Sequence, residues 1–322
     1  MNIKKNVLLS MYEMLIKIRL FEEKLIELHP EQDMKCLQHY CIGQEAITVG
    51  INAHLNNKDK IFCSFRSHGH YLAKGGKLKP IFSELYLKSN GLMRGRGGSM
   101  HLSDLSIGLS GSFVIVGSYV PIAVGTALSI KIKKENNVVV VFFGDGAIDE
   151  GVIYEAFNFA ALKSLPIIFV CENNGIASMS KDEERQAQLN HNLKSEAFGV
   201  PAISVDGQNV IEVYNSFSKA MNRAKKGKGP TFINAKTFRF KAHIGVGDDI
   251  GPGLRTKKEL DKQKKKDPIE LFKKKLIKLK IIDEQKEAQI INQINKKLES
   301  AVNHAKASPL GNIDDLIEDV YA

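Results

Sequence analysis

Residues 138–174 read VVVVFFGDGAIDEGVIYEAFNFAALKSLPIIFVCENN. The stretch opens with one short apolar run, residues 138–143, and closes with another, residues 167–170, each leading into a polar turn. Such runs, rich in Val, Ile and Phe and without alternation, are typical of parallel strands buried on both faces. Residues 147–164 place apolar side chains at helical spacing, with Pro166 just beyond. The stretch therefore predicts a βαβ unit whose polar turns share the ligand-binding edge of an α/β sheet.

The first of these turns, Gly144-Asp145-Gly146, indicates a metal. Two glycines allow the backbone to approach a phosphate closely, but the Asp145 carboxylate would repel that phosphate unless a divalent cation lay between them. Asp145 and Asn174 offer hard oxygens, and Mg²⁺ commonly takes one or two such ligands and completes its octahedron with phosphate oxygens and water. We therefore expect a Mg²⁺-bridged phosphate site at these turns.

Two other phosphate-binding motifs do not fit the same stretch. A dinucleotide-binding turn needs Gly-x-Gly-x-x-Gly, but its sixth position here is Asp149, and no Gly-x-x-x-x-Gly-Lys-Ser/Thr occurs in the chain. An ordinary strand-to-helix turn with a capping Asp stays open as the alternative, because Gly-Asp-Gly alone is a weak signal.

The spacing of the two polar turns, Gly-Asp-Gly, 26 residues and then Asn-Asn, resembles the thiamine diphosphate fingerprint. The chain as a whole resembles the alpha subunit of the first component of 2-oxo acid dehydrogenase complexes, of the pyruvate or acetoin dehydrogenase type. The further motifs, in the family's order and spacing, are GQEA at 43–46, RSHG at 66–69, GRGGSMH at 95–101, IVG at 115–117 and FRF at 238–240. The resemblance covers nearly the whole chain.

This resemblance implies an α/β fold, the diphosphate-binding half of the thiamine diphosphate-binding architecture, with a mainly parallel sheet flanked by helices. We expect one domain over residues 1–322, with an N-terminal helix at about 5–28 and a C-terminal helical extension at about 257–322. Further strands are expected at 61–64, 203–207 and 231–240, with a helix at 210–224. The glycine-rich segment 91–117 is expected to be loop, with its apolar residues 113–116 forming a packed wall.

Site residues follow from the same resemblance. The expected Mg²⁺ ligands are Asp145, Asn174 and the main-chain carbonyl of Ile176. The expected cofactor-binding residues are Phe65, Arg66, Val114, Val116, Asp145, Gly146, Ala147, Asn174 and His243. The valines would meet the aminopyrimidine ring, and the planar fork of Arg66 suits a phosphate in its own right. The expected catalytic residues are three histidines: His39 near the substrate, His68 near the cofactor, and His243, which would also assist acyl transfer.

Several positions depart from the family pattern. Phe65 stands where relatives often have a tyrosine whose hydroxyl reaches the diphosphate. Lys241 and Ala242 replace a usual histidine or glycine. Ile244 and Val246 stand where some eukaryotic members carry phosphorylated serines, so we do not expect phosphorylation control there.

The implied function is that of a thiamine diphosphate-dependent oxidoreductase that decarboxylates a 2-oxo acid and passes the acyl group to lipoamide. Acetoin dehydrogenase is the alternative, since SHGHYLAKG at 67–75 is similar to that branch. The implied partners are a beta subunit that carries the pyrimidine-binding domain, in an α₂β₂ assembly, and a lipoyl-bearing acyltransferase. The small-residue segment 121–130 is expected to be a helix in a subunit contact.

Composition and charge bear on three other classes of protein: zinc proteins, membrane proteins and nucleic-acid-binding proteins. The chain has 322 residues, 43% of them hydrophobic, and its four cysteines show no metal-like spacing, which indicates reduced thiols and no zinc site. Charged residues interrupt the N-terminal apolar pattern, so we expect no signal or membrane span and a cytoplasmic location. The net charge of +10 raises a nucleic-acid-binding alternative, but the eleven lysines at 257–280 lack interleaved aromatics and are more typical of a solvated face.

Overall fold

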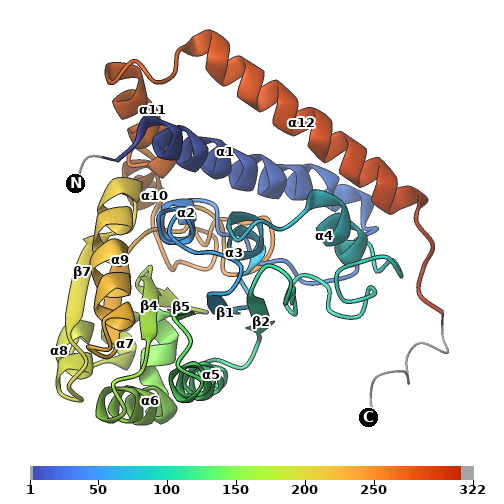
Figure 1. The fold of residues 1–322 in the computed structure, drawn as a ribbon. Helices are drawn as coiled ribbons and strands as arrows, with labels where there is room; N and C mark the ends of the chain where they lie inside the picture. The colour runs from blue at the N-terminus through green and yellow to red at the C-terminus, as the bar shows by residue number, and fades with distance from the viewer. Residues whose placement is uncertain (1–2, 313–322) are drawn as a thin grey trace.

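The computed structural model describes residues 3–312, which form a parallel sheet with helices on both faces (Figure 1). Within this range six strands pair in the order β2-β1-β3-β4-β8-β7, every pair parallel. The strands are β1 (Lys60–Ser64), β2 (Leu109–Phe113), β3 (Val139–Gly144), β4 (Ile167–Asn173), β7 (Ala202–Asp206) and β8 (Thr231–Lys236). The expected α/β class with a mainly parallel sheet is confirmed.

The βαβ unit at the centre of the sheet also matches the prediction. β3 and β4 pair in register from Val139 opposite Ile167 to Gly144 opposite Glu172, and α6 (Gly151–Leu162) connects them. A short 3-10 turn, η2 (Asp145–Asp149), precedes α6 where the sequence suggested that the helix had already begun. Because the strands end together, the two polar turns lie at one edge of the sheet.

Three expectations about local structure were wrong. Leu109–Phe113 is an edge strand, β2, inside the segment expected to be loop. Its pairing with β1 shifts register between Ile61 and Phe62, and an edge strand that contains glycine tolerates such an irregularity. The apolar residues after β2 do not form a packed wall, since Ile115 is 67% and Val116 is 44% exposed. The strand expected at 231–240 ends at Lys236, where pairing with β4 stops.

Two apolar clusters cover the two faces of the sheet. On one face lie α1 (Lys5–Leu28), α2 (Glu45–Asn52), α3 (His68–Ala73), α4 (Leu78–Leu85) and α9 (Val210–Lys225). On the other face, α5 (Val120–Ile132) and α6 pack against the side chains that point the opposite way from β3 and β4. Side chains alternate between faces along a strand, so a continuous apolar run supplies both clusters.

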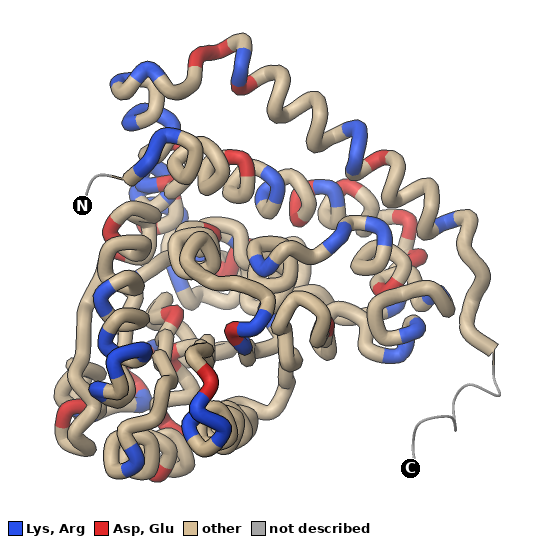
Figure 2. The backbone as a smooth tube through the Cα atoms, in the orientation of Figure 1, with Lys and Arg blue, Asp and Glu red and all other residues tan. Residues whose placement is uncertain are grey.

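The C-terminal helices pack against the first cluster. α10 (Lys257–Lys264) and α11 (Pro268–Lys278) are followed by α12 (Glu284–Ala307), which runs along α1 and α4 (Figure 1). Side chains of Asp267 and Asp283 cap α11 and α12 by accepting hydrogen bonds from the backbone N–H groups of Ile269 and Lys286. Lys and Arg recur along these helices (Figure 2). No helix within residues 3–312 has the length and apolar character needed to cross a membrane.

Candidate active site

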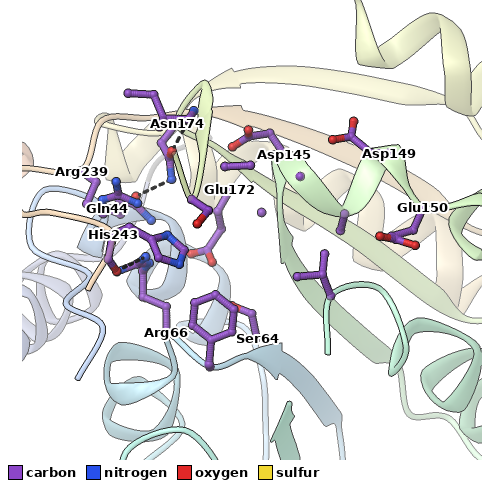
Figure 3. A pocket seen from close by; sticks show the side chains of 18 of the residues that line it. Gln44, Ser64, Arg66, Asp145, Asp149, Glu150, Glu172, Asn174, Arg239 and His243 are labelled. Carbon is purple, nitrogen blue, oxygen red and sulfur yellow. Dashed lines mark hydrogen bonds between the residues drawn. The ribbon is translucent and has the colours of Figure 1, made fainter. Parts of the chain in front are cut away.

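A cavity of about 360 Å³ opens at the carboxyl ends of β1, β3 and β4. It collects most of the residues expected at the cofactor site from distant parts of the chain. Those that line it are Phe65, Arg66, Val116, Asp145, Gly146, Ala147, Asn174, Ile176 and His243. Figure 3 shows Arg66, Arg239 and His243 on one side and Asp145, Asp149 and Glu150 on the other. The cavity is therefore electrostatically polarised.

The acidic side centres on Asp145, which follows β3 and is 2% exposed. Burial raises the pKa of the Asp145 carboxyl, and the positive charge of Arg185 opposes that increase. The guanidinium of Arg185 donates a hydrogen bond from Nη2 to Asp145 Oδ2 at 2.8 Å and also pairs with Asp149. A carboxylate buried in this way is stabilised by a nearby positive charge, which Arg185 supplies in this structure and a bound divalent cation would also supply.

Other hard oxygens lie beside Asp145. Asn174 follows β4; its amide donates to Gln44 Oε1 at 3.0 Å, and its Oδ1 accepts from the Ile176 backbone N–H at 3.2 Å. Ile176 begins a short hairpin, β5 (Ile176–Ala177) and β6 (Ser180–Lys181). A Cβ at Gly146 would come within 2.7 Å of the Ala177 Cβ, so the glycine permits close approach of this hairpin. A carboxylate, an amide and a main-chain carbonyl fit Mg²⁺.

The basic side centres on Arg66, which is 6% exposed at the end of β1. Its guanidinium donates to the carbonyls of Tyr40 at 2.7 Å and His243 at 3.1 Å, and no carboxylate of residues 3–312 pairs with it. Burial and the charge of Arg239 lower the pKa of Arg66 to about 10, which leaves it cationic at neutral pH. A buried guanidinium held by carbonyls alone suits an anionic ligand such as a diphosphate.

Two of the predicted histidines pack beside Arg66. The ring centroids of His39 and His243 lie 5.3 Å apart, and Phe65 contacts both rings, at 4.3 Å and 5.6 Å respectively. Burial, followed by the charge of Arg66, lowers the pKa of His39 to about 3 and of His243 to about 4. Both imidazoles are therefore neutral at pH 7. His243 lines the cavity, whereas His39 lies behind it, outside the lining residues.

Comparison with known proteins decides the family. A sequence model described as the dehydrogenase E1 component matches residues 12–314. The chain belongs to this family. It is 38% identical to the alpha subunit of the acetoin:2,6-dichlorophenolindophenol oxidoreductase of Bacillus subtilis, with 97% of this chain and 93% of the relative covered. It is 36% identical to the chloroplastic pyruvate dehydrogenase E1 component subunit alpha-3 of Arabidopsis thaliana, over 98% of this chain and 74% of the relative.

A bacterial pyruvate dehydrogenase chain gives a similar result. The E1 component subunit alpha of Zymomonas mobilis is 33% identical, with 97% of this chain and 88% of that protein covered. E1 components are thiamine diphosphate-dependent oxidoreductases, so this chain belongs to an enzyme of that type. The polarised cavity at the carboxyl edge is its candidate cofactor site.

Two residues predicted for the E1 site lie away from this cavity. His68 is fully buried, 3.2 Å from Glu22 Oε1 through Nδ1 and 2.7 Å from Ser99 Oγ through Nε2. It links α1 and α3 to the glycine-rich loop, so in this chain it is placed to hold that loop. Val114 does not line the cavity either, although Val116 does.

Several cavity residues of this E1 chain were not predicted as site residues. They are Gln44, Tyr119, Glu150, Glu172 and Arg239, and Arg185 contacts the site through Asp145. Glu172 belongs to the polar turn after the second apolar run, so the sequence places it among residues that can hold a metal or phosphate, although it was not among the expected ligands. Gln44 and Arg239 lie within quoted motifs, but nothing local in the sequence singles out Arg185, which lies 40 residues from Asp145.

Proposed function

We propose that the chain is the alpha subunit of a thiamine diphosphate-dependent 2-oxo acid dehydrogenase of the pyruvate type, which decarboxylates its substrate and transfers the acyl group to lipoamide. The observation that carries the proposal is one cavity with buried Asp145 on one side and buried, carboxylate-free Arg66 on the other, within residues 3–312. A Mg²⁺-diphosphate complex would place an anion beside Arg66 and a second cation beside Asp145, which also pairs with Arg185. Relatives named as pyruvate dehydrogenase E1 alpha subunits, in a plant and in bacteria, support the substrate class.

Each group in the cavity has a proposed task. Asp145, Asn174 and the carbonyl of Ile176 hold Mg²⁺. Arg66, His243 and the backbone at Gly146 and Ala147 bind the diphosphate, and Val116 contacts the aminopyrimidine ring. When bound, thiamine diphosphate supplies the electron sink for cleavage next to a carbonyl. Neutral His243 faces the cavity and is available to accept a proton there. His39 packs against the ring of His243, and His68 holds the glycine-rich loop through Ser99.

Acetoin cleavage is the second candidate. It is favoured by the acetoin oxidoreductase alpha subunits of Bacillus subtilis and of Cupriavidus necator, which are 38% and 36% identical to this chain. Turnover of pyruvate, branched 2-oxo acids and acetoin, measured with an artificial electron acceptor, separates the two reactions. Predominant turnover of acetoin would replace the pyruvate-type assignment.

The proposal includes two protein partners: a beta subunit with the pyrimidine-binding domain, in an α₂β₂ assembly, and a lipoyl-bearing acyltransferase. The relatives named as alpha subunits support a heteromeric enzyme. The four cysteines are all free thiols, which agrees with a reducing compartment, and we place the enzyme in the cytoplasm.

Calorimetry with thiamine diphosphate tests the metal assignment. Asp145→Asn keeps the size of the side chain but removes its charge, so we expect Mg²⁺-dependent cofactor affinity to fall at least tenfold. Asp149→Asn is the matched control, since Asp149 also pairs with Arg185 but is not a proposed ligand. Equal affinity in the wild type and in Asp145→Asn would refute the assignment.

A further inference from the structure

A second cavity, of about 590 Å³, lies between α1, α12 and the segment that begins α4. It shares no lining residue with the cofactor cavity among residues 3–312. We call it the lysine groove, because lysines from three separate parts of the chain line it: Lys17, Lys77, Lys79, Lys296 and Lys297. In Figure 2, basic positions recur on α1, on α12 and at the start of α4.

The charge of the groove is not neutralised. Its lining contains no Asp or Glu, and none of its lysines forms an ion pair within the described part of the chain. Two other lysines at contacts of α12 are paired: Lys24 of α1 binds Glu299 of α12 at 2.6 Å, and Lys306 of α12 binds Glu31 at 2.6 Å. The lysines of the groove therefore have no carboxylate partner among the described residues, although Lys17 and Lys297 also line an adjoining cavity that contains Glu13.

Lys17 is the most enclosed of these cations. It is partly buried on α1, and its Nζ donates only to the Gly76 carbonyl, at a long 3.4 Å, within residues 3–312. Burial lowers the pKa of Lys17, and the nearby charge of Lys297 lowers it further. Both effects cost free energy that an anion placed between the two amines would offset.

The walls of the groove add two further features. α4 begins at Leu78 with no side-chain cap and no acidic residue in its first turn, so its N-terminal partial positive charge is added to that of the lysines. Leu78, Pro80, Ile294 and Ala301 supply an apolar wall beside the amines. A ligand that matches both parts carries concentrated negative charge on a small apolar body, and the cavity has the volume of a small-molecule site.

We propose that the lysine groove binds a small organic phosphate. The phosphate lies among the amines of Lys17, Lys79 and Lys297 at the start of α4, and the organic part contacts Leu78 and Ile294. Lysine is a common phosphate ligand because its ammonium acts as a point charge that needs no fixed geometry. This site is independent of the proposed dehydrogenase function, because it neither adjoins the cofactor cavity nor uses any of its residues.

Calorimetry on the full-length chain, in the complex in which it purifies and saturated with Mg²⁺ and thiamine diphosphate, tests the site. Saturation removes competition at the cofactor cavity. The probes are phenyl phosphate, inorganic phosphate and phenol. We expect phenyl phosphate to bind more tightly than inorganic phosphate and phenol not to bind, because the groove needs both charge and an apolar contact.

Charge-matched variants distinguish a built site from general attraction to a basic protein. Lys17→Met/Lys297→Met should weaken phenyl phosphate binding at least tenfold, whereas Lys264→Met/Lys278→Met, on exposed parts of α10 and α11, should change it less than twofold. Lys79→Gln/Lys297→Gln alters only exposed side chains and serves if the Lys17 variant fails to fold. No binding by the wild type, equal losses in both charge-matched pairs, or binding of phenol would each overturn the proposal.

Discussion

Asp145 and Arg66 are buried charges of opposite sign, and of the two only Asp145 has an oppositely charged partner among the described residues. Asp145 has Arg185 at 2.8 Å, and Arg66 has only carbonyl acceptors within residues 3–312. Burying a charge without a partner costs several kcal/mol, by order of magnitude. Burial of the Arg66 charge is therefore unfavourable in the free chain, and a bound anion would recover part of that free energy. The fold thus keeps a buried cation whose unfavourable burial strengthens the binding of an anionic ligand.

The depressed pKa of His39 predicts a specific dependence of stability on pH. His39 has a pKa of about 3 in the folded chain and about 6.5 when unfolded, so between these values only the unfolded chain binds the proton. Its contribution is fully present above about pH 6.5 and is lost as pH falls. From pH 7 to pH 5 we expect this residue to reduce the free energy of unfolding by about 2 kcal/mol.

Urea unfolding of His39→Gln at these two pH values measures that contribution. The variant should show a smaller loss of stability between them than the wild type. The control is His29→Gln, because His29 is an exposed residue of the short helix η1 (His29–Glu31). An unchanged pH dependence in His39→Gln would contradict the prediction.

Glu84 is a buried carboxylate that organises the glycine-rich loop. Its oxygens accept from the backbone N–H groups of Met93 at 2.6 Å, Gly95 at 2.9 Å, Gly97 at 2.7 Å and Gly98 at 3.0 Å. In Glu84→Gln an NH₂ group would face two of these donors. Since hydrogen bonds to a charged group contribute about 1.5–3 kcal/mol each, we expect a loss of about 3 kcal/mol in the free energy of unfolding.

Thermal and urea denaturation of Glu84→Gln give that loss directly. Glu299→Gln provides the comparison, because Glu299 is an exposed partner of Lys24 and should contribute less than about 1 kcal/mol. Equal stability of the two variants would show that Glu84 does not hold the loop.

At the scale of elements, the sequence predicts those strands and helices that carry a regular apolar pattern and are buried. β3, β4 and α6 were predictable because a short continuous apolar run favours a buried strand, and apolar residues at helical spacing favour a helix. The edge strand β2 was not predictable, because Leu109–Phe113 mixes glycine and serine with apolar residues. It forms strand hydrogen bonds only by pairing with β1, which is distant in the sequence: Cys63 contacts Gly111 across 48 residues. The contact of Arg185 with Asp145 is likewise a product of tertiary structure alone.

The approach of the β5–β6 hairpin to η2 determines whether Asp145 and Ile176 can share a ligand. Gly146→Ala would place a Cβ 2.7 Å from the Ala177 Cβ and must displace backbone or hairpin. We expect Mg²⁺-dependent thiamine diphosphate affinity to fall about tenfold, with the helices of the fold retained. Calorimetry and circular dichroism measure the two effects.

Gly151→Ala is the matched control for this prediction. Gly151 begins α6 near the same turn, and a Cβ there would have no neighbour within 4 Å among the described residues. A parallel loss of affinity in both alanine variants would refute the steric explanation.

At the scale of the whole molecule, apolar side chains beside the cavity are left uncovered. Ile115 is 67%, Val116 is 44% and Ile122 is 52% exposed, on the loop after β2 and at the start of α5. A Cβ at Gly125 of α5 would meet nothing within 4 Å in the described chain, so this small-residue face is open to close approach. Clustered exposed apolar residues indicate a protein interface. This exposed apolar surface adjoins the side of the cavity at Val116, where the aminopyrimidine ring is expected.

We therefore expect catalysis to require the beta subunit. The described residues form one six-stranded parallel sheet with one polarised cavity, and the pyrimidine-binding domain is expected on the beta subunit. The purified chain, saturated with Mg²⁺ and thiamine diphosphate, should be folded but should turn over neither pyruvate, branched 2-oxo acids nor acetoin. Co-purification with the beta subunit should restore activity in an α₂β₂ assembly.

Variants of the exposed apolar surface provide a second test of whether catalysis requires the beta subunit. Ile122→Asp should prevent assembly and activity, because a charge buried in an apolar interface is strongly unfavourable. Leu271→Asp should leave both unchanged, because Leu271 is similarly exposed, at 40%, but lies on α11 away from the cavity. Sedimentation and turnover distinguish the two variants. Full turnover by the isolated chain, without any second subunit, would show that the active site is complete within this chain.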